Sequence, residues 1–243
     1  MKTVIIIPAR YDSTRFKGKI LASETGKYLV QHTYETAAKA ESADKVIIAV
    51  DSEKVLQACQ SFGAECVLTD PALKSGTDRV AKAAENTDCD IIVNVQADEP
   101  EIDPKNIDLL AKLLENNKEA DMATLVTPVK DRREAENPNA VKAVVAENGY
   151  AIYFTRQPVP YSRKDGQPNL SLMKRHLGVY AYRKDFLMKI TQMHQTPLEI
   201  SESLEQLRAL ENGFRIIADE IPEAHEGIDT EKQYMAFVKR ILK

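Results

Sequence analysis

The sequence predicts an α/β fold, in which a doubly wound, Rossmann-like mixed sheet is covered by helices. Short apolar runs typical of buried parallel strands open the chain and recur along its first half. Amphipathic segments with a helical spacing of apolar residues separate these runs. Because strands that alternate with helices form right-handed crossover units, we expect the first half to build a parallel sheet.

The elements of the first half follow one another at regular spacing. We predict a strand at each short apolar run. We predict a helix at each polar segment whose apolar residues fall on one helical face. The strands are predicted at 4–7, 45–50, 65–68 and 90–95, and the helices at 28–40, 53–62, 77–85 and 104–117.

The second half is less regular, so we expect the sheet to become mixed there. Strands are predicted at 122–128, 141–146, 151–154, 176–182 and 215–219, and helices at 198–211 and from 231 onwards. The polar stretch SRKDGQPNLSLMKR, residues 162–175, contains proline and glycine and is typical of a loop or arm. We therefore predict one domain, 1–243, with a small secondary lobe at about 130–180.

Composition excludes several classes of function. The 243 residues are 43% hydrophobic, but no apolar run is long enough to span a bilayer, and we expect a cytoplasmic protein without membrane insertion. A net charge of -4 disfavours broad nucleic-acid binding. Cys59, Cys66 and Cys89 lack the C-x-x-C spacing of zinc sites, and we interpret them as small core residues.

Four polar side chains follow the first predicted strand, where ligands bind in open α/β sheets. Arg10, Ser13, Arg15 and Lys19 supply cations and a hydroxyl, and Gly18 allows the chain to wrap closely around a phosphate. No two glycines are two residues apart, so G-x-G-x-x-G is absent, and no P-loop motif occurs. A solvated surface cluster is the alternative, but the position favours a site for a triphosphate.

Two aspartates are candidates for a metal site. Asp98 follows the strand predicted at 90–95, and Asp229 lies between Gly227 and the expected helix cap Thr230. A turn aspartate before Pro100 is the alternative for the first of them. Because Mg²⁺ prefers one or two carboxylates together with water and phosphate oxygens, this pair suggests a magnesium site.

Eight stretches together resemble one known family. They are IIPARYDSTRFKGK, SGTDR, VNVQADEP, NPNAVK, GYAIYFTR, RHLGVYAYR, LEQLRALENG and GIDT. Their order and spacing are similar to those of the 3-deoxy-manno-octulosonate (Kdo) cytidylyltransferases, also called CMP-Kdo synthetases. The resemblance covers the chain from the first strand to the last helix, and it implies a sheet of the nucleotide-diphospho-sugar transferase type.

The resemblance implies transfer of CMP from CTP to the anomeric hydroxyl of Kdo, with release of pyrophosphate, for lipopolysaccharide biosynthesis. It implies that Arg10, Lys19, Asp98 and Asp229 are catalytic, and that Asp98 and Asp229 hold Mg²⁺ between the α-phosphate and the attacking oxygen. The residues implied for binding the nucleotide are Arg10, Ser13, Arg15, Lys19, Ser75, Gly76 and Arg79.

The residues implied for binding the acid sugar are Gln96, Arg156, His176, Tyr180, Glu205 and Gln206. The arginine or a protonated histidine would pair with the sugar carboxylate. The alternatives are a hydrogen-bonded strand histidine, a core tyrosine and a solvated helix face, because Glu199, Glu202 and Glu205 recur at a spacing of three.

Three departures from the family pattern concern the loops. Ala97 replaces a glycine, Lys17 stands where proline is common, and Ile20 replaces a second proline. We expect Ala97 to adopt an ordinary backbone conformation. The acceptor could instead be 8-amino-Kdo or a sialic acid, or the chain could be a CTP-binding module without activity. The resemblance also implies a homodimer, formed through about 154–180.

Overall fold

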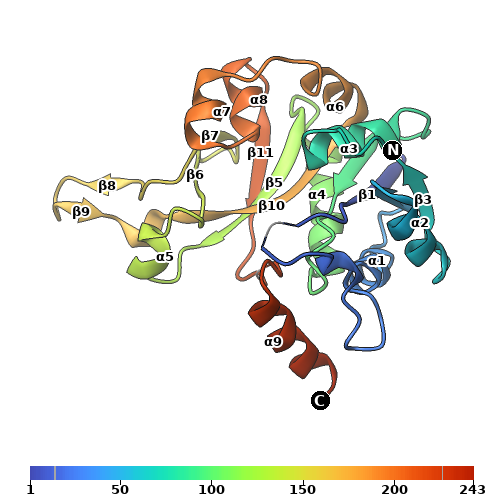
Figure 1. The fold of residues 1–243 in the computed structure, drawn as a ribbon. Coiled ribbons are helices and arrows are strands. Elements are labelled where there is room, and N and C mark those ends of the chain that lie inside the picture. Colours follow the sequence, from blue (N-terminus) through green and yellow to red (C-terminus); the bar gives the residue numbers. More distant parts are fainter. Residues whose placement is uncertain (14, 226) are drawn as a thin grey trace. The chain divides into compact units, whose positions relative to one another are not determined.

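The computed structural model describes residues 1–13, 15–225 and 227–243 (Figure 1). The chain divides into two compact units. Unit 1 comprises Met1–Ala111 and His225–Lys243, and unit 2 comprises Lys112–Ala224. The lobe predicted at about 130–180 falls inside unit 2, and the single domain predicted for 1–243 stays a prediction. No helix in the described part of the chain is long and apolar enough to cross a bilayer.

Unit 1 contains the parallel strands predicted for the first half of the chain. In spatial order β4–β1–β2–β3, the strands are β4 (Ile91–Asn94), β1 (Thr3–Ala9), β2 (Lys45–Val50) and β3 (Glu65–Leu68). All seven residues of β1 are buried, which explains why it is apolar from Val4 to Ala9 instead of alternating. The carboxyl ends of β1 and β4 therefore lie side by side and bring the loops that follow them together.

Several helices of unit 1 begin at side-chain caps, of which the sequence analysis predicted Thr230. Ser52 accepts the Val55 N–H at the start of α2, and Thr230 forms a capping box with Gln233 at the start of α9. The helices are the 3-10 helix η1 (Lys19–Leu21), α1 (Leu29–Ala37), α2 (Glu53–Gln60), α3 (Gly76–Ala84), α4 (Pro104–Asn116, which continues into unit 2) and α9 (Glu231–Ile241).

Unit 2 contains the mixed sheet predicted for the second half. Strand β11 pairs parallel with β5, whereas the pairs β5–β10, β10–β6 and β6–β7 are antiparallel. The strands are β5 (Met122–Pro128), β6 (Lys142–Val145), β7 (Ala151–Thr155), β10 (Lys174–Arg183) and β11 (Ile216–Glu220). The segment predicted as a loop or arm forms a short hairpin of β8 (Tyr161–Ser162) and β9 (Gln167–Pro168), followed by the 3-10 helix η2 (Leu170–Leu172).

The helices of unit 2 differ most from the prediction. The single helix expected at 198–211 is wrong, because Ser203, in the left-handed conformation at φ 52°, separates α7 (Pro197–Glu202) from α8 (Gln206–Glu211). A buried ion pair joins the two short helices: Arg208 donates to both oxygens of Glu199, at 2.8 and 2.5 Å. Two further helices, α5 (Arg132–Glu136) and α6 (Lys184–Ile190), were not predicted.

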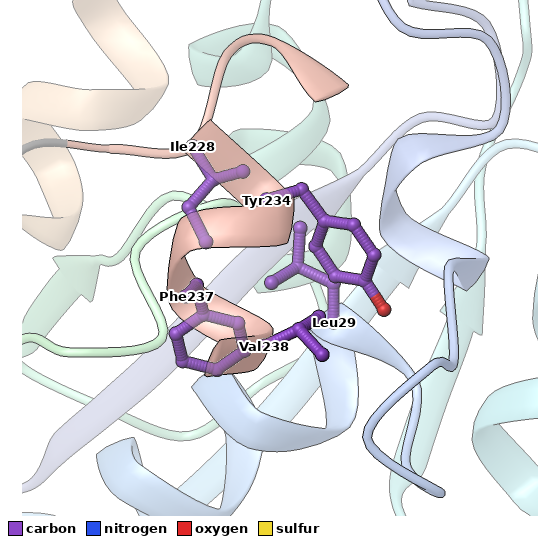
Figure 2. Packing of buried hydrophobic residues seen from close by; sticks show 5 residues of the cluster. All are labelled: Leu29, Ile228, Tyr234, Phe237 and Val238. Atoms are coloured by element: carbon purple, nitrogen blue, oxygen red, sulfur yellow. The ribbon is translucent and has the colours of Figure 1, made fainter. Parts of the chain in front are cut away.

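An apolar cluster attaches α9 to α1 within unit 1. Figure 2 shows its side chains: Leu29 of α1 with Ile228, Tyr234, Phe237 and Val238. The tyrosine hydroxyl also accepts the Glu24 N–H at 2.9 Å, so its polar end is satisfied. Because Ile228 directly precedes Asp229, this packing fixes the position of that aspartate in unit 1.

We predict that Phe237→Ala destabilises the protein strongly, whereas Met235→Ala on the same helix does not. The phenylalanine is 1% exposed, so its loss should lower the free energy of unfolding by about 3–5 kcal/mol, the usual cost of a large cavity. The methionine is 40% exposed and serves as the matched control. Thermal unfolding measures both, and equal midpoints for the two variants would contradict the packing.

Candidate functional site

The loop after β1 carries the predicted cations and curves back on itself. Arg10 follows the last residue of β1 and is exposed, and Ser13 is half-buried. Arg15 donates from NH2 to Asp229 Oδ1 at 2.8 Å. Lys19 is buried at the start of η1, after Gly18 with φ +68°. Only glycine adopts this left-handed conformation without strain, which explains the glycine beside the lysine.

The two predicted carboxylates meet at the ammonium group of Lys19. Its Nζ donates to Asp98 Oδ2 at 2.6 Å and to Asp229 Oδ1 at 3.5 Å. The chain holds the two loops together independently of this contact, because the Ile228 N–H donates to the Asp98 carbonyl at 2.8 Å. Two carboxylates and one buried cation thus form the centre of the candidate site.

The neighbours of Asp98 explain how the departures from the family pattern are accommodated. Ala97 is buried and has a negative φ, as expected, and its carbonyl accepts the Thr33 hydroxyl at 3.0 Å. Burial, with a smaller contribution from the charge of Asp98, raises the pKa of Glu99 to about 8. The neutral form of Glu99 therefore predominates at neutral pH. Lys17 is exposed.

The start of α3 lies beside the ends of β1 and β4. Ser75 caps the helix, and its hydroxyl oxygen accepts the Asp78 N–H at 3.0 Å. A Cβ added to Gly76 would lie 3.6 Å from Pro8 Cγ and 4.0 Å from Gln96 Oε1. The predicted Ser75, Gly76 and Gln96 therefore lie together in unit 1, around a helix amino terminus that favours anions.

Arg79 is the most deeply buried of the predicted cations. Its side chain is fully buried, and NH1 donates to the Thr69 hydroxyl and, at 3.4 Å, to the Asp70 carbonyl. Among the described residues, Nε and NH2 have no hydrogen-bond partner. Burial lowers the pKa of this guanidinium, while the charge of Asp51 acts in the opposite direction.

Arg156, predicted to bind the sugar carboxylate, makes backbone contacts in unit 2. Nε donates to the Glu202 carbonyl at 2.6 Å, NH1 to the Pro138 carbonyl at 2.8 Å and NH2 to the Ser203 carbonyl at 3.2 Å. The guanidinium thus ties the end of β7 to the end of α7, and its role in binding a substrate stays a prediction.

His176 and Tyr180 lie next to each other because β10 contains a bulge. The register shifts between Leu177 and Tyr180, which brings the rings of His176 and Tyr180 to 5.4 Å between centroids. His176 Nε2 lies 3.0 Å from the Thr124 hydroxyl. Burial lowers the pKa of His176 to about 3, which favours the neutral imidazole in the free protein, and its pairing with the sugar carboxylate stays a prediction.

The glutamates of the segment 199–205 do not form a solvated helix face. Glu199 is buried against Arg208, and Glu202 accepts the Thr155 hydroxyl at 2.7 Å. Glu205 is half-buried just before α8. Gln206 is buried, and its Nε2 has no hydrogen-bond partner within the described part of the chain.

Sequence reasoning missed the residues that support the cation loop. Both oxygens of Asp51 accept the Tyr11 N–H, at 3.0 and 3.2 Å, and Lys54 Nζ donates to the Tyr11 hydroxyl at 2.7 Å. Asp51 directly follows β2, so the rule that singled out Asp98 after β4 applies to it equally.

Comparisons with known proteins agree with this geometry. A family model described as cytidylyltransferase matches residues 4–220. Two relatives named 3-deoxy-manno-octulosonate cytidylyltransferase come from Rhodopirellula baltica, 44% identical over 99% of both chains, and Chloroherpeton thalassium, 49% identical over 89% of this chain and 88% of the relative.

A solved structure described as CMP:2-keto-3-deoxy-manno-octonic acid synthetase complexed with CTP has the same fold. It matches with a TM-score of 0.94 and 36% identity, over 100% of this chain and 99% of that one. The match confirms the predicted α/β class and the nucleotide-diphospho-sugar transferase type of sheet. The chain therefore belongs to the 3-deoxy-manno-octulosonate cytidylyltransferase family.

Proposed function

We propose that this protein transfers CMP from CTP to the anomeric hydroxyl of Kdo and releases pyrophosphate. Family membership and the CTP complex of a relative 36% identical support this reaction. The observation that carries the proposal is the convergence of Asp98 and Asp229 on Lys19. Such a cluster offers a cation for phosphate and two carboxylates for a metal at one point.

The nucleotide would bind in unit 1, where three kinds of anion-binding group are available. Arg10, Arg15 and Lys19 provide charge, and the amino terminus of α3 provides backbone N–H groups. The Nε and NH2 of Arg79, which have no hydrogen-bond partner among the described residues, are buried donors that a bound nucleotide could satisfy. These cations would also stabilise the negative charge that develops on the leaving pyrophosphate.

Asp98 and Asp229 are the residues that would hold Mg²⁺. No group of three or more potential ligand side chains occurs among residues 1–13, 15–225 and 227–243. Two carboxylates nevertheless fit Mg²⁺, which takes its other ligands from water and phosphate. Both reach the same cationic nitrogen, so the donor set is already gathered. Bound there, the metal would supply charge neutralisation and a lower pKa for the attacking hydroxyl.

The acid sugar would be recognised by groups of unit 2. Gln206 offers a buried amide N–H for a sugar hydroxyl, and Glu205 offers an acceptor. Because His176 is neutral in the free protein, it would act as a hydrogen-bonding group, beside Tyr180, and Arg156 would be the cation for the carboxylate.

We also propose that the protein acts in the cytoplasm as a homodimer, joined through the segment 154–180. The hairpin and η2 expose Tyr161 and Leu172 at 66% and 62%, and a cavity of about 280 Å³ lies between α5 and the hairpin. A second copy of the same segment would bury this apolar surface.

Pyrophosphate release from CTP, Mg²⁺ and Kdo tests the reaction and the metal ligands together. We predict that Asp98→Asn and Asp229→Asn each lower the rate at least about 100-fold, the scale of losing one preorganised electrostatic group. Both should also raise the Mg²⁺ concentration needed for half-maximal rate. Asp88→Asn, which alters an exposed ion pair with Lys2, is the control.

Three outcomes would contradict parts of this assignment. A folded Asp98→Asn variant with full activity excludes the metal role. Faster turnover of 8-amino-Kdo or a sialic acid than of Kdo identifies a different acceptor. A wild-type protein that binds CTP but releases no pyrophosphate with any acid sugar is a binding module.

We predict that His176 makes the protein less stable in acid. The unfolded chain takes up a proton near pH 6.5, whereas the folded protein does so only at about 3, so stability is present above pH 6.5 and is lost as the pH falls. The slope approaches about 1.4 kcal/mol per pH unit. Urea unfolding of His176→Gln, which lacks this contribution, should depend less steeply on pH. The exposed His194→Gln is the control and should keep the wild-type slope.

The homodimer predicts that Leu172→Glu produces a monomer, because a buried unpaired carboxylate is costly. Light scattering coupled to gel filtration measures the mass. Leu198→Glu, on the exposed face of α7, is the matched control in the same unit. A dimer that persists in the Leu172 variant excludes this surface as the interface.

A further inference from the structure

Four residues form a clasp at the base of the cation loop, which we call the Tyr11 clasp: Tyr11, Gly18, Asp51 and Lys54. The Tyr11 N–H donates to both carboxylate oxygens of Asp51, at 3.0 and 3.2 Å. Lys54 Nζ donates to the Tyr11 hydroxyl at 2.7 Å and lies 4.3 Å from the centre of its ring. A Cβ added to Gly18 would lie 3.5 Å from the same ring.

The clasp closes the loop between residues 11 and 18. Arg10 immediately precedes the clasp and Lys19 immediately follows it, so contact of the Tyr11 ring with Gly18 brings the backbone of both cations to the base of the loop. The left-handed φ of Gly18 makes the return possible. The spacing of the two cations therefore depends on contacts that neither cation makes.

Within the described part of the chain, the hydrogen bonds of Asp51 go to the cation loop and not to the helix that follows it. Ser52, not Asp51, caps α2, and both oxygens of Asp51 accept the Tyr11 N–H. Its charge favours the protonated form of Arg79, whereas the charge of Arg10 opposes it. The carboxylate thus lies where it offsets the repulsion between two cations of the nucleotide site.

We propose that Asp51 and Lys54 are positioning residues for triphosphate binding, acting through Tyr11 on the loop that carries Arg10 and Lys19. This inference rests on the proposed function, since it assumes that the loop grips CTP. The decisive contact is the hydrogen bond from the Tyr11 N–H to Asp51, because it fixes the backbone one residue after Arg10. The contact with Lys54 is exposed and supports the ring.

The test compares Asp51→Ala with Asp51→Asn. The alanine variant should raise the KM for CTP about tenfold, equivalent to about 1.4 kcal/mol, with little change in kcat or in the KM for Kdo. The asparagine variant keeps an acceptor oxygen for the Tyr11 N–H and should stay within about threefold of wild type. Lys54→Met should raise the KM for CTP less than Asp51→Ala does, because an exposed cation–π contact is weak.

Amide hydrogen exchange of the CTP-free protein provides a second readout that does not require activity. Exchange in residues 10–19 should be faster in Asp51→Ala than in wild type and close to wild type in Asp51→Asn. Lys45→Met is the matched control for Lys54→Met, since Lys45 forms an exposed ion pair with Glu65 at the other end of β2. It should leave both the exchange and the KM for CTP unchanged.

The outcomes separate this inference from the proposed function. If Asp51→Ala lowers the melting temperature but changes neither the KM for CTP nor the exchange, Asp51 is merely structural and the inference is wrong. If Asp51→Asn is as impaired as Asp51→Ala, the charge acts instead of the hydrogen bond, which also overturns it. If wild type releases no pyrophosphate, the proposed function fails, and the exchange of residues 10–19 still supports or overturns the clasp.

Discussion

The ion cluster around Lys19 is the constraint on which the geometry of unit 1 depends. Two carboxylates converge without strong repulsion because a buried ammonium lies against both. Bringing them there requires three features of the chain. The loop after β1 must curve back, which Gly18 allows. The turn after β4 must approach the segment before α9, which the Ile228 N–H secures at the Asp98 carbonyl. Finally, α9 must pack within unit 1, and its apolar contact with Leu29 holds it there.

The sequence predicted much of this cluster, because a general rule of α/β folds locates ligand-binding side chains after the strands. That rule selected Arg10, Lys19 and Asp98 before any resemblance was considered. It applied equally to Asp51, which follows β2, but the partner of this carboxylate is a backbone N–H 40 positions away, which no local pattern indicates. The contact between Lys19 and Asp229 spans 210 positions in the chain. No local sequence pattern shows that two residues so far apart in the chain are in contact. The sequence therefore predicted that the loops come together but not the contacts within the site.

Unit 2 shows why charge periodicity is a weak guide to exposure. Glu199, Glu202 and Glu205 recur at helical spacing, which made a solvated helix face the alternative to a binding role for Glu205. In the structure, Glu199 is buried because Arg208 neutralises it, and Glu202 accepts hydrogen bonds from Thr155 and the Arg156 backbone. The partners come from other elements, so the sequence around the glutamates does not reveal them. The ion pair of Glu199 and Arg208 also joins α7 to α8, which the left-handed Ser203 separates. Local periodicity does not indicate this break.

The predicted ligand-binding groups fall into two physical kinds, and the difference bears on specificity. Arg156 donates three of its five N–H groups to backbone carbonyls, so binding a substrate would use its remaining N–H donors or require a change of partners. Arg79 and Gln206 carry buried nitrogens without partners in the described part of the chain. Each such donor costs about 1–3 kcal/mol in the free protein. A ligand that supplies the missing acceptor recovers this cost, whereas an analogue without it does not. Within the described part of each unit, the buried donor without a partner is therefore the group that should discriminate most between ligands.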